Sequence, residues 1–122
     1  MTLRAQIATE LAAVLPSNIK IVDNPRSLDG VEAKRPVVQL YRSRLSKAAN
    51  ALGTYQHTFS IWLVSPNIDP RRSDDTLDEY LDILLPALGT IQYLNWTDAV
   101  RSVYGDQQAP AYEITATVLT TP

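Results

Sequence analysis

Cysteine is absent from the 122 residues, and histidine and phenylalanine each occur only once. Without cysteine the chain forms no disulfide and offers no thiolate ligand to a metal. Any histidine-based metal site or Ser-His-Asp triad would have to be built around His57 alone, which lies among apolar neighbours. A structural histidine is the commoner case in such a setting, so we assign His57 no functional role.

Familiar catalytic and nucleotide-binding motifs are missing as well. The sequence contains no GxxxxGK, GxGxxG, GxSxG, HExxH or CxxC. Asp74, Asp78 and Asp82 are spaced to share one helix face and could in principle hold Mg²⁺ or Ca²⁺, but no second group of ligands and no EF-hand loop accompanies them. We therefore expect a solvated or partner-facing acidic surface, and no enzyme activity, catalytic residue, cofactor or metal.

Long apolar runs are also lacking, and no segment approaches the roughly 20 residues of a membrane-spanning helix. Arg4, Gln6 and Glu10 interrupt the apolar pattern of the first segment, which therefore has no signal-peptide core. We expect a protein that is made and kept in the cytoplasm, with no membrane partner.

The residues that are present describe an ordinary globular chain. Apolar residues make up 45% and charged residues 20%, which suits one domain spanning residues 1–122. The net charge of −2 argues against a protein whose main task is to bind nucleic acid, since such binding needs clustered Lys and Arg.

Helical spacing of apolar residues marks two segments. The first runs from Leu3 to Leu15, with Thr2 as its expected N-cap and Pro16 after its end. The second is "DDTLDEYLDILLPALG", for which we expect Ser73 as the N-cap, aspartates in the first turn and an end or kink at Pro86. Its stripe of leucines should pack on the sheet beside Phe59 and Ile61, with the acidic side facing outward. These leucines are Leu77, Leu81, Leu84 and Leu88.

Five segments predict strands, at residues 18–23, 37–42, 55–64, 94–104 and 111–119. Residues 43–54 have no strong strand signal, and we expect a long loop there. In "YQHTFSIWLV" the odd positions are mostly apolar, whereas the even positions begin polar and end with Trp62 and Val64. One face of this strand therefore belongs to the core. The second face also carries apolar side chains, Trp62 and Val64, which something other than that core must shield from water.

The order of these elements is α-β-β-β-α-β-β, which predicts an α+β fold. We expect a single, mostly antiparallel sheet with both helices packed on one face. The open face would carry polar residues around Trp62, which suits contact with another protein chain. Trp62 and Val64 are accordingly candidate interface residues.

Charged residues supply further interface candidates. Arg42, Arg44 and Lys47 concentrate positive charge around the expected loop, and the second helix carries negative charge. The helix candidates are Asp75, Asp78, Glu79 and Asp82. On opposite sides of one domain, these groups would favour head-to-tail association that closes into a ring.

The layout of the whole chain resembles the tail terminator proteins of long-tailed bacteriophages. The resemblance lies in the order, length and character of the segments rather than in one motif. These segments are "LRAQIATELAAVLP", "KIVDNP", "RPVVQLYR", "HTFSIWLVSP", "DDTLDEYLDILLPAL", "WTDAVRSVYG" and "AYEITATVL".

What the resemblance implies is a structural virion protein that forms a homohexameric ring, caps the tail tube and stops its polymerisation. Its partners would be other copies of itself, the tail tube protein and the head-side connector. It would reside in the virion tail after assembly in the host cytoplasm, and the genome would pass through the ring without specific nucleic-acid binding. Two alternatives remain, namely another head–tail connector or neck protein, and a small ligand-binding α+β domain.

Overall fold

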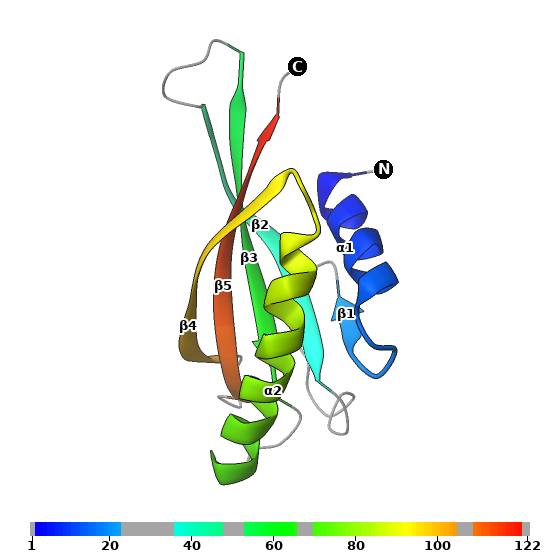
Figure 1. Cartoon of the computed structure of the whole chain (residues 1–122). Helices are drawn as coiled ribbons and strands as arrows, with labels where there is room; N and C mark the ends of the chain where they lie inside the picture. The colour runs from blue at the N-terminus through cyan, green and yellow to red at the C-terminus, as the bar shows by residue number, and fades with distance from the viewer. Residues whose placement is uncertain (1, 23–35, 48–52, 66–69, 105–108, 121–122) are drawn as a thin grey trace.

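The computed structural model describes residues 2–22, 36–47, 53–65, 70–104 and 109–120, apart from the side chains of residues 70–74 and 109. Their elements follow the order α-β-β-β-α-β-β and form an α+β fold, as predicted (Figure 1). The helices and strands are α1 (Leu3–Val14), β1 (Lys20–Val22), β2 (Val37–Lys47), β3 (Tyr55–Val64), α2 (Pro70–Gly89), β4 (Leu94–Tyr104) and β5 (Ala109–Thr120).

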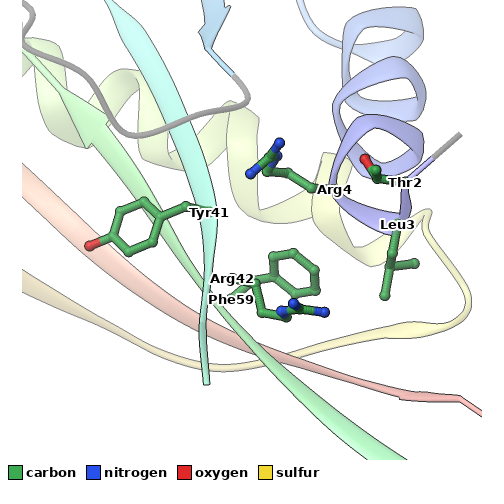
Figure 2. A pocket seen from close by; sticks show the side chains of 6 residues that line it. All are labelled: Thr2, Leu3, Arg4, Tyr41, Arg42 and Phe59. Carbon is green, nitrogen blue, oxygen red and sulfur yellow. The ribbon is translucent and has the colours of Figure 1, made fainter. Parts of the chain in front are cut away.

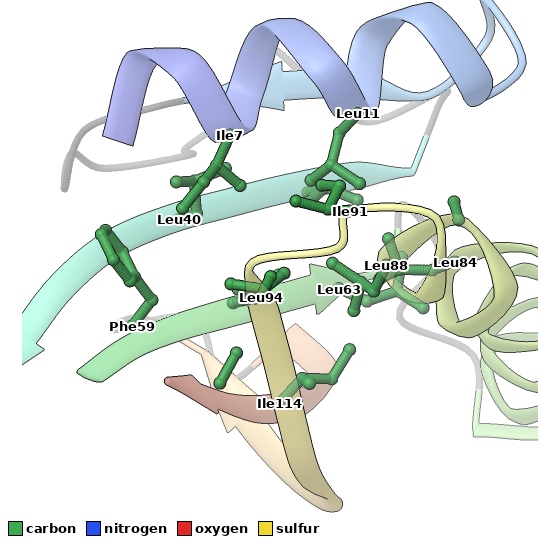
Figure 3. Packing of buried hydrophobic residues seen from close by; sticks show 14 of the residues in the cluster. Ile7, Leu11, Leu40, Phe59, Leu63, Leu84, Leu88, Ile91, Leu94 and Ile114 are labelled. Atoms are coloured by element: carbon green, nitrogen blue, oxygen red, sulfur yellow. The ribbon is translucent and has the colours of Figure 1, made fainter. Parts of the chain in front are cut away.

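The five strands make one sheet in the order β1-β2-β3-β5-β4. Among the described strands only β1 and β2 pair in parallel, and the other three pairings are antiparallel. Both helices pack on the same face of this sheet, where the main hydrophobic core lies (Figure 3). Phe59, Ile61 and Leu63 are almost fully buried there, so the odd positions of β3 face the core as the alternating pattern predicts.

The first helix begins and ends where the sequence indicates. The side chain of Thr2 accepts a hydrogen bond from the backbone N–H of Ala5, which satisfies one of the unpaired donors of the first turn. Ile7 and Leu11, one turn apart, are fully buried against the sheet and the second helix. Leu15 takes an extended conformation as the C-cap, directly before Pro16.

The second helix begins earlier than predicted. It starts at Pro70, so Ser73 lies inside the helix, and the expected Ser73 cap and acidic first turn are wrong. Proline is favoured at the first helical position because its fixed φ angle suits a helix and its missing N–H is not needed there. Pro86 is accommodated within the helix, on its exposed side, and the helix continues to Gly89.

Leucines of α2 pack on the sheet, as expected from their spacing. Leu77, Leu84 and Leu88 are buried in the main core, which also contains Phe59 and Ile61. Leu81 is only half-buried and contributes to the margin of the same core. The buried stripe of α2 therefore follows three of the four expected leucines.

The prediction of a loop from residue 43 is wrong for residues 43–47, because β2 continues to Lys47. Its distal half pairs with β3 as far as Lys47 opposite Tyr55, and a bulge lies between Arg42 and Arg44. Figure 1 shows this part of the hairpin extending past the ends of both helices. We call residues 42–47 and 55–59 the hairpin arm; of its connection, residues 48–52 lie outside the described part of the chain.

Candidate assembly surfaces

The second face of the sheet is covered in part by the chain itself. Val22, Val37, Val64 and Ala111 form a second buried cluster on this face, with Val64 only 5% exposed. The side chain of Val64 is already buried within its own subunit, so little of it is exposed for contact with a partner. The apolar end of the second face of β3 is therefore covered in part within the subunit, without a partner chain.

Trp62 is half-buried beside the same cluster. Its indole Nε1 donates a hydrogen bond to the hydroxyl of Tyr41 over 3.2 Å, and its ring centre lies 5.0 Å from that of Tyr104 at a tilt of 57°. Both contacts are favourable for an indole, because its N–H needs a hydrogen-bond acceptor and its ring packs well against another aromatic ring. Trp62 therefore has intramolecular partners and still reaches the surface.

Tyr104 shows how strongly the sheet is curled. Its hydroxyl donates a hydrogen bond to the side-chain oxygen of Gln39, which is fully buried. Gln39 lies on β2 and Tyr104 on β4, although β3 and β5 separate these strands in the sheet. Figure 1 shows β4 crossing its neighbouring strands at an angle. The hydrogen bond shows that the sheet curls far enough to bring Tyr104 to Gln39. Burial, and secondarily Tyr41, raise the pKa of Tyr104 above its ordinary value.

The three predicted cations lie on the hairpin arm and are exposed. Arg42 is paired with Phe59 and therefore lies on the helix-bearing face of the sheet, whereas Arg44 is paired with Thr58 on the opposite face. Lys47 is paired with Tyr55 near the tip. The positive charge thus belongs to an ordered pair of strands and is presented on both of their faces, rather than on a long loop.

His57 has a structural setting on this arm. Its Nε2 lies 2.8 Å from the hydroxyl oxygen of Thr120, and its Nδ1 lies 3.5 Å from a terminal nitrogen of Arg42. Its ring stacks on Phe59 with centres 6.5 Å apart. Burial, with Arg42 as a second cause, lowers the pKa of His57 below 6.5, which favours the neutral imidazole at pH 7. Neutral imidazole can donate to Thr120 through one nitrogen and accept from Arg42 through the other.

Large apolar side chains are exposed on the arm and the strand beside it. Leu45 is 48% and Tyr55 42% exposed, and register places both on the helix-bearing side of the arm. Leu119 of β5 is 61% exposed on the opposite side. Single exposed apolar residues are common, but several on one projecting element are typical of a contact surface.

The predicted acidic residues lie along α2. Asp75, Asp78, Glu79 and Asp82 are all exposed. In Figure 1 α2 begins at the end of the subunit remote from the hairpin arm. Asp75, Asp78 and Glu79 lie in the first half of α2 (Pro70–Gly89), and Asp82 lies just past its middle. The acidic candidates therefore lie toward the end of the subunit opposite the basic arm.

Two sheet edges are open along the described residues. None of the described strands pairs with the outer side of β4, and β1 pairs with β2 only as far as Gln39. The outer strand β4 also exposes Val100 and Val103, at 54% and 52%. Unpaired strand edges of this kind can accept another chain by backbone hydrogen bonding.

Sequence reasoning missed Tyr41 and Tyr104 as the side-chain partners of Trp62, and Gln39 as the acceptor for Tyr104. Gln39 did carry a signal, as a polar residue within the apolar run "VVQL", but its partner Tyr104 lies 65 positions away. Over the described residues, no group of three or more His, Asp or Glu is arranged to hold a metal. No helix in that part of the chain is long and apolar enough to cross a membrane.

No protein-family model matches this chain, and a search of curated proteins finds no significant match.

Proposed function

We propose that this protein is a structural component of a bacteriophage tail, which assembles into a ring, caps the tail tube and stops its polymerisation. The proposal starts from the resemblance of the segment order to tail terminator proteins. Its main structural support is the separation of a basic, partly apolar hairpin arm from an acidic helix surface at the far end of the same subunit.

Opposite charges at opposite ends favour a heterologous contact, in which the arm of one subunit meets α2 of the next. Contacts of this type either close into a ring or continue as a filament, according to the rotation between neighbours. Each exposed charge pair contributes only about 0–1 kcal/mol, so charge alone would not hold the ring together. The exposed Leu45 and Tyr55 on the arm provide apolar area that an assembled neighbour would cover.

A tube cap also needs two unlike faces. A growing tube end exposes surface that would bind the next ring of tube protein, and a cap stops growth only when its outer face cannot accept another tube subunit. In this proposal the ring binds the tube protein on one side and the head-side connector on the other. The genome passes through the ring, no reaction is catalysed, and the protein resides in the virion tail.

A charge-swap experiment tests the arm-to-helix contact. Native mass spectrometry would measure the mass of the wild type, alone and with tube protein, against the 13.5 kDa subunit. Reversing the arm cations Arg42, Arg44 and Lys47 to Glu should abolish assembly, as should reversing the four acidic residues of α2 to Lys. Combining both sets of substitutions should restore assembly, because every pair is again of opposite charge.

The possible results separate the parts of the proposal. A wild type that stays monomeric at all concentrations, alone and with tube protein, contradicts the ring. A ring that survives both single reversals contradicts the arm-to-helix contact and leaves the open edges of β2 and β4 as the contact surface. Circular dichroism serves as the folding control, since the reversed side chains are exposed.

A further inference from the structure

A pocket of about 390 Å³ lies between the first turn of α1 and the middle of β2 (Figure 2). Its volume falls in the range of small-ligand pockets, roughly 300–1,000 Å³. The residues that line it are Thr2, Leu3, Arg4, Tyr41, Arg42 and Phe59. They come from three elements that are distant in sequence, so the pocket is a product of the tertiary fold.

One part of the pocket is apolar. Phe59 is 1% exposed and belongs to the main core, and Leu3 is partly buried against the same core. In Figure 2 the ring of Tyr41 points away from the other side chains, consistent with its contact to Trp62 on the second face. Leu3 and Phe59 therefore provide the apolar wall, which suits a hydrocarbon group.

Another part of the pocket is cationic and incompletely satisfied. The Nε of Arg4 is buried and has no hydrogen-bond partner. Buried donors are normally paired, and leaving one unpaired is costly. The guanidinium of Arg42 has one weak contact, to Nδ1 of His57 at 3.5 Å. Two guanidinium groups thus share one pocket, and within the described part of the chain neither contacts a carboxylate.

We propose that this pocket binds a carboxylate carried on an apolar group. Arginine presents a planar set of donors that fits a carboxylate, and a carboxylate oxygen would satisfy the buried Nε–H of Arg4. The apolar part of the ligand would lie against Phe59 and Leu3. The ligand comes either from solution as a small organic acid or from an acidic segment of a polypeptide, and both sources supply the same chemistry.

The backbone also favours an anion at the same place. The first turn of α1 carries the positive end of the helix dipole. This feature makes no site alone, but it adds to the field of the two arginines.

The test is a titration of the full chain followed by NMR of the arginine Nε–H groups and by calorimetry. The probes are phenylacetate, its neutral counterpart phenylacetamide, acetate, and a peptide copying residues 75–82 as an acidic polypeptide. We expect phenylacetate or the peptide to shift the Arg4 Nε–H signal saturably, phenylacetamide to have no effect, and acetate to bind at least about tenfold more weakly than phenylacetate. Binding by phenylacetate indicates a small acid, and binding by the peptide alone indicates a polypeptide source.

Three substitutions locate the binding. Arg42→Gln removes one charge, and Arg4→Lys keeps the charge but removes the Nε–H; each should weaken binding by about tenfold or more. Arg44→Gln is the matched control, because Arg44 lies on the same strand but on the opposite face, and it should change binding less than about twofold.

Either of two results would overturn the proposal: no saturable shift with any carboxylate, or equal weakening by Arg44→Gln and Arg42→Gln. The proposal concerns the single subunit and does not rest on the ring. A titration without binding would therefore contradict the ligand proposal but not the proposed tail function. A protein that stays monomeric would contradict the ring but not ligand binding in the pocket.

Discussion

Replacing Tyr104 by Phe removes one hydroxyl from the curled face of the sheet and leaves the ring in place. That hydroxyl donates to the side-chain oxygen of Gln39, a fully buried residue three strands away in the sheet. The ring contact to Trp62, with centres 5.0 Å apart, needs only the aromatic ring and should persist. The substitution therefore isolates the loss of one hydrogen bond to a buried acceptor, which costs about 1–3 kcal/mol.

Urea unfolding followed by tryptophan fluorescence would measure this difference, at one protein concentration for all variants because assembly also changes apparent stability. Tyr55→Phe is the matched control: Tyr55 is 42% exposed on the hairpin arm, so its loss of a hydroxyl should change the free energy of unfolding by less than about 0.5 kcal/mol. A Tyr104→Phe variant as stable as this control would refute the inferred curl, because the contact to Gln39 exists only if β4 bends toward β2.

Three further predictions concern stability. Leu84→Ala should lower the free energy of unfolding by about 2–5 kcal/mol because Leu84 is fully buried, and Leu81→Ala by less because Leu81 is half-buried; equal losses in denaturant unfolding would contradict the packing of α2. The pKa of His57 is lowered on folding, so the unfolded chain takes up the proton first and stability should fall as the pH drops below 6.5. In the His57→Gln variant, stability should change less with pH in this range. An unchanged curve would show that protonation of His57 does not cause the loss of stability. Burial and a hydrogen bond to Glu10 raise the pKa of Tyr93 on folding, so stability should decline as the pH rises above 10.0, less steeply in Tyr93→Phe; equal alkaline slopes for the two proteins would contradict this.

Local patterns were enough to predict the core side of the fold. Alternation along β3 identified Phe59 and Ile61 as core residues, and helical spacing placed Leu84 and Leu88 on the sheet side of α2. Thr2 was recognisable as a cap because its role depends on residues within one turn. For these residues the physical cause is local, and the sequence was sufficient.

One error has a cause that is not local. Residues 43–47 have weak strand propensity of their own and are ordered by cross-strand pairing with β3, which single-segment reasoning does not register. The misplaced start of α2 is different, because two local signals compete there. Ser73 is a good cap in isolation, whereas the chain begins the helix at Pro70.

The charged residues of the candidate surfaces could be predicted from the sequence, but their positions in space could not. The sequence identified the basic and the acidic residues, whereas their position at opposite ends follows from the direction of α2 relative to the hairpin arm. The pocket lined by Arg4 and Arg42 was not foreseeable, because residues 38 positions apart meet there only through the fold.

The most direct measurement of the proposed function is the length of tail tubes formed in its presence. Purified tail tube protein would be polymerised with increasing, substoichiometric amounts of this protein, and tube lengths would be measured by electron microscopy. The account predicts shorter tubes with increasing dose and a ring of this protein at one tube end. The variant with Arg42, Arg44 and Lys47 reversed to Glu should cap poorly. A length distribution that does not change with added wild-type protein would contradict the proposed function.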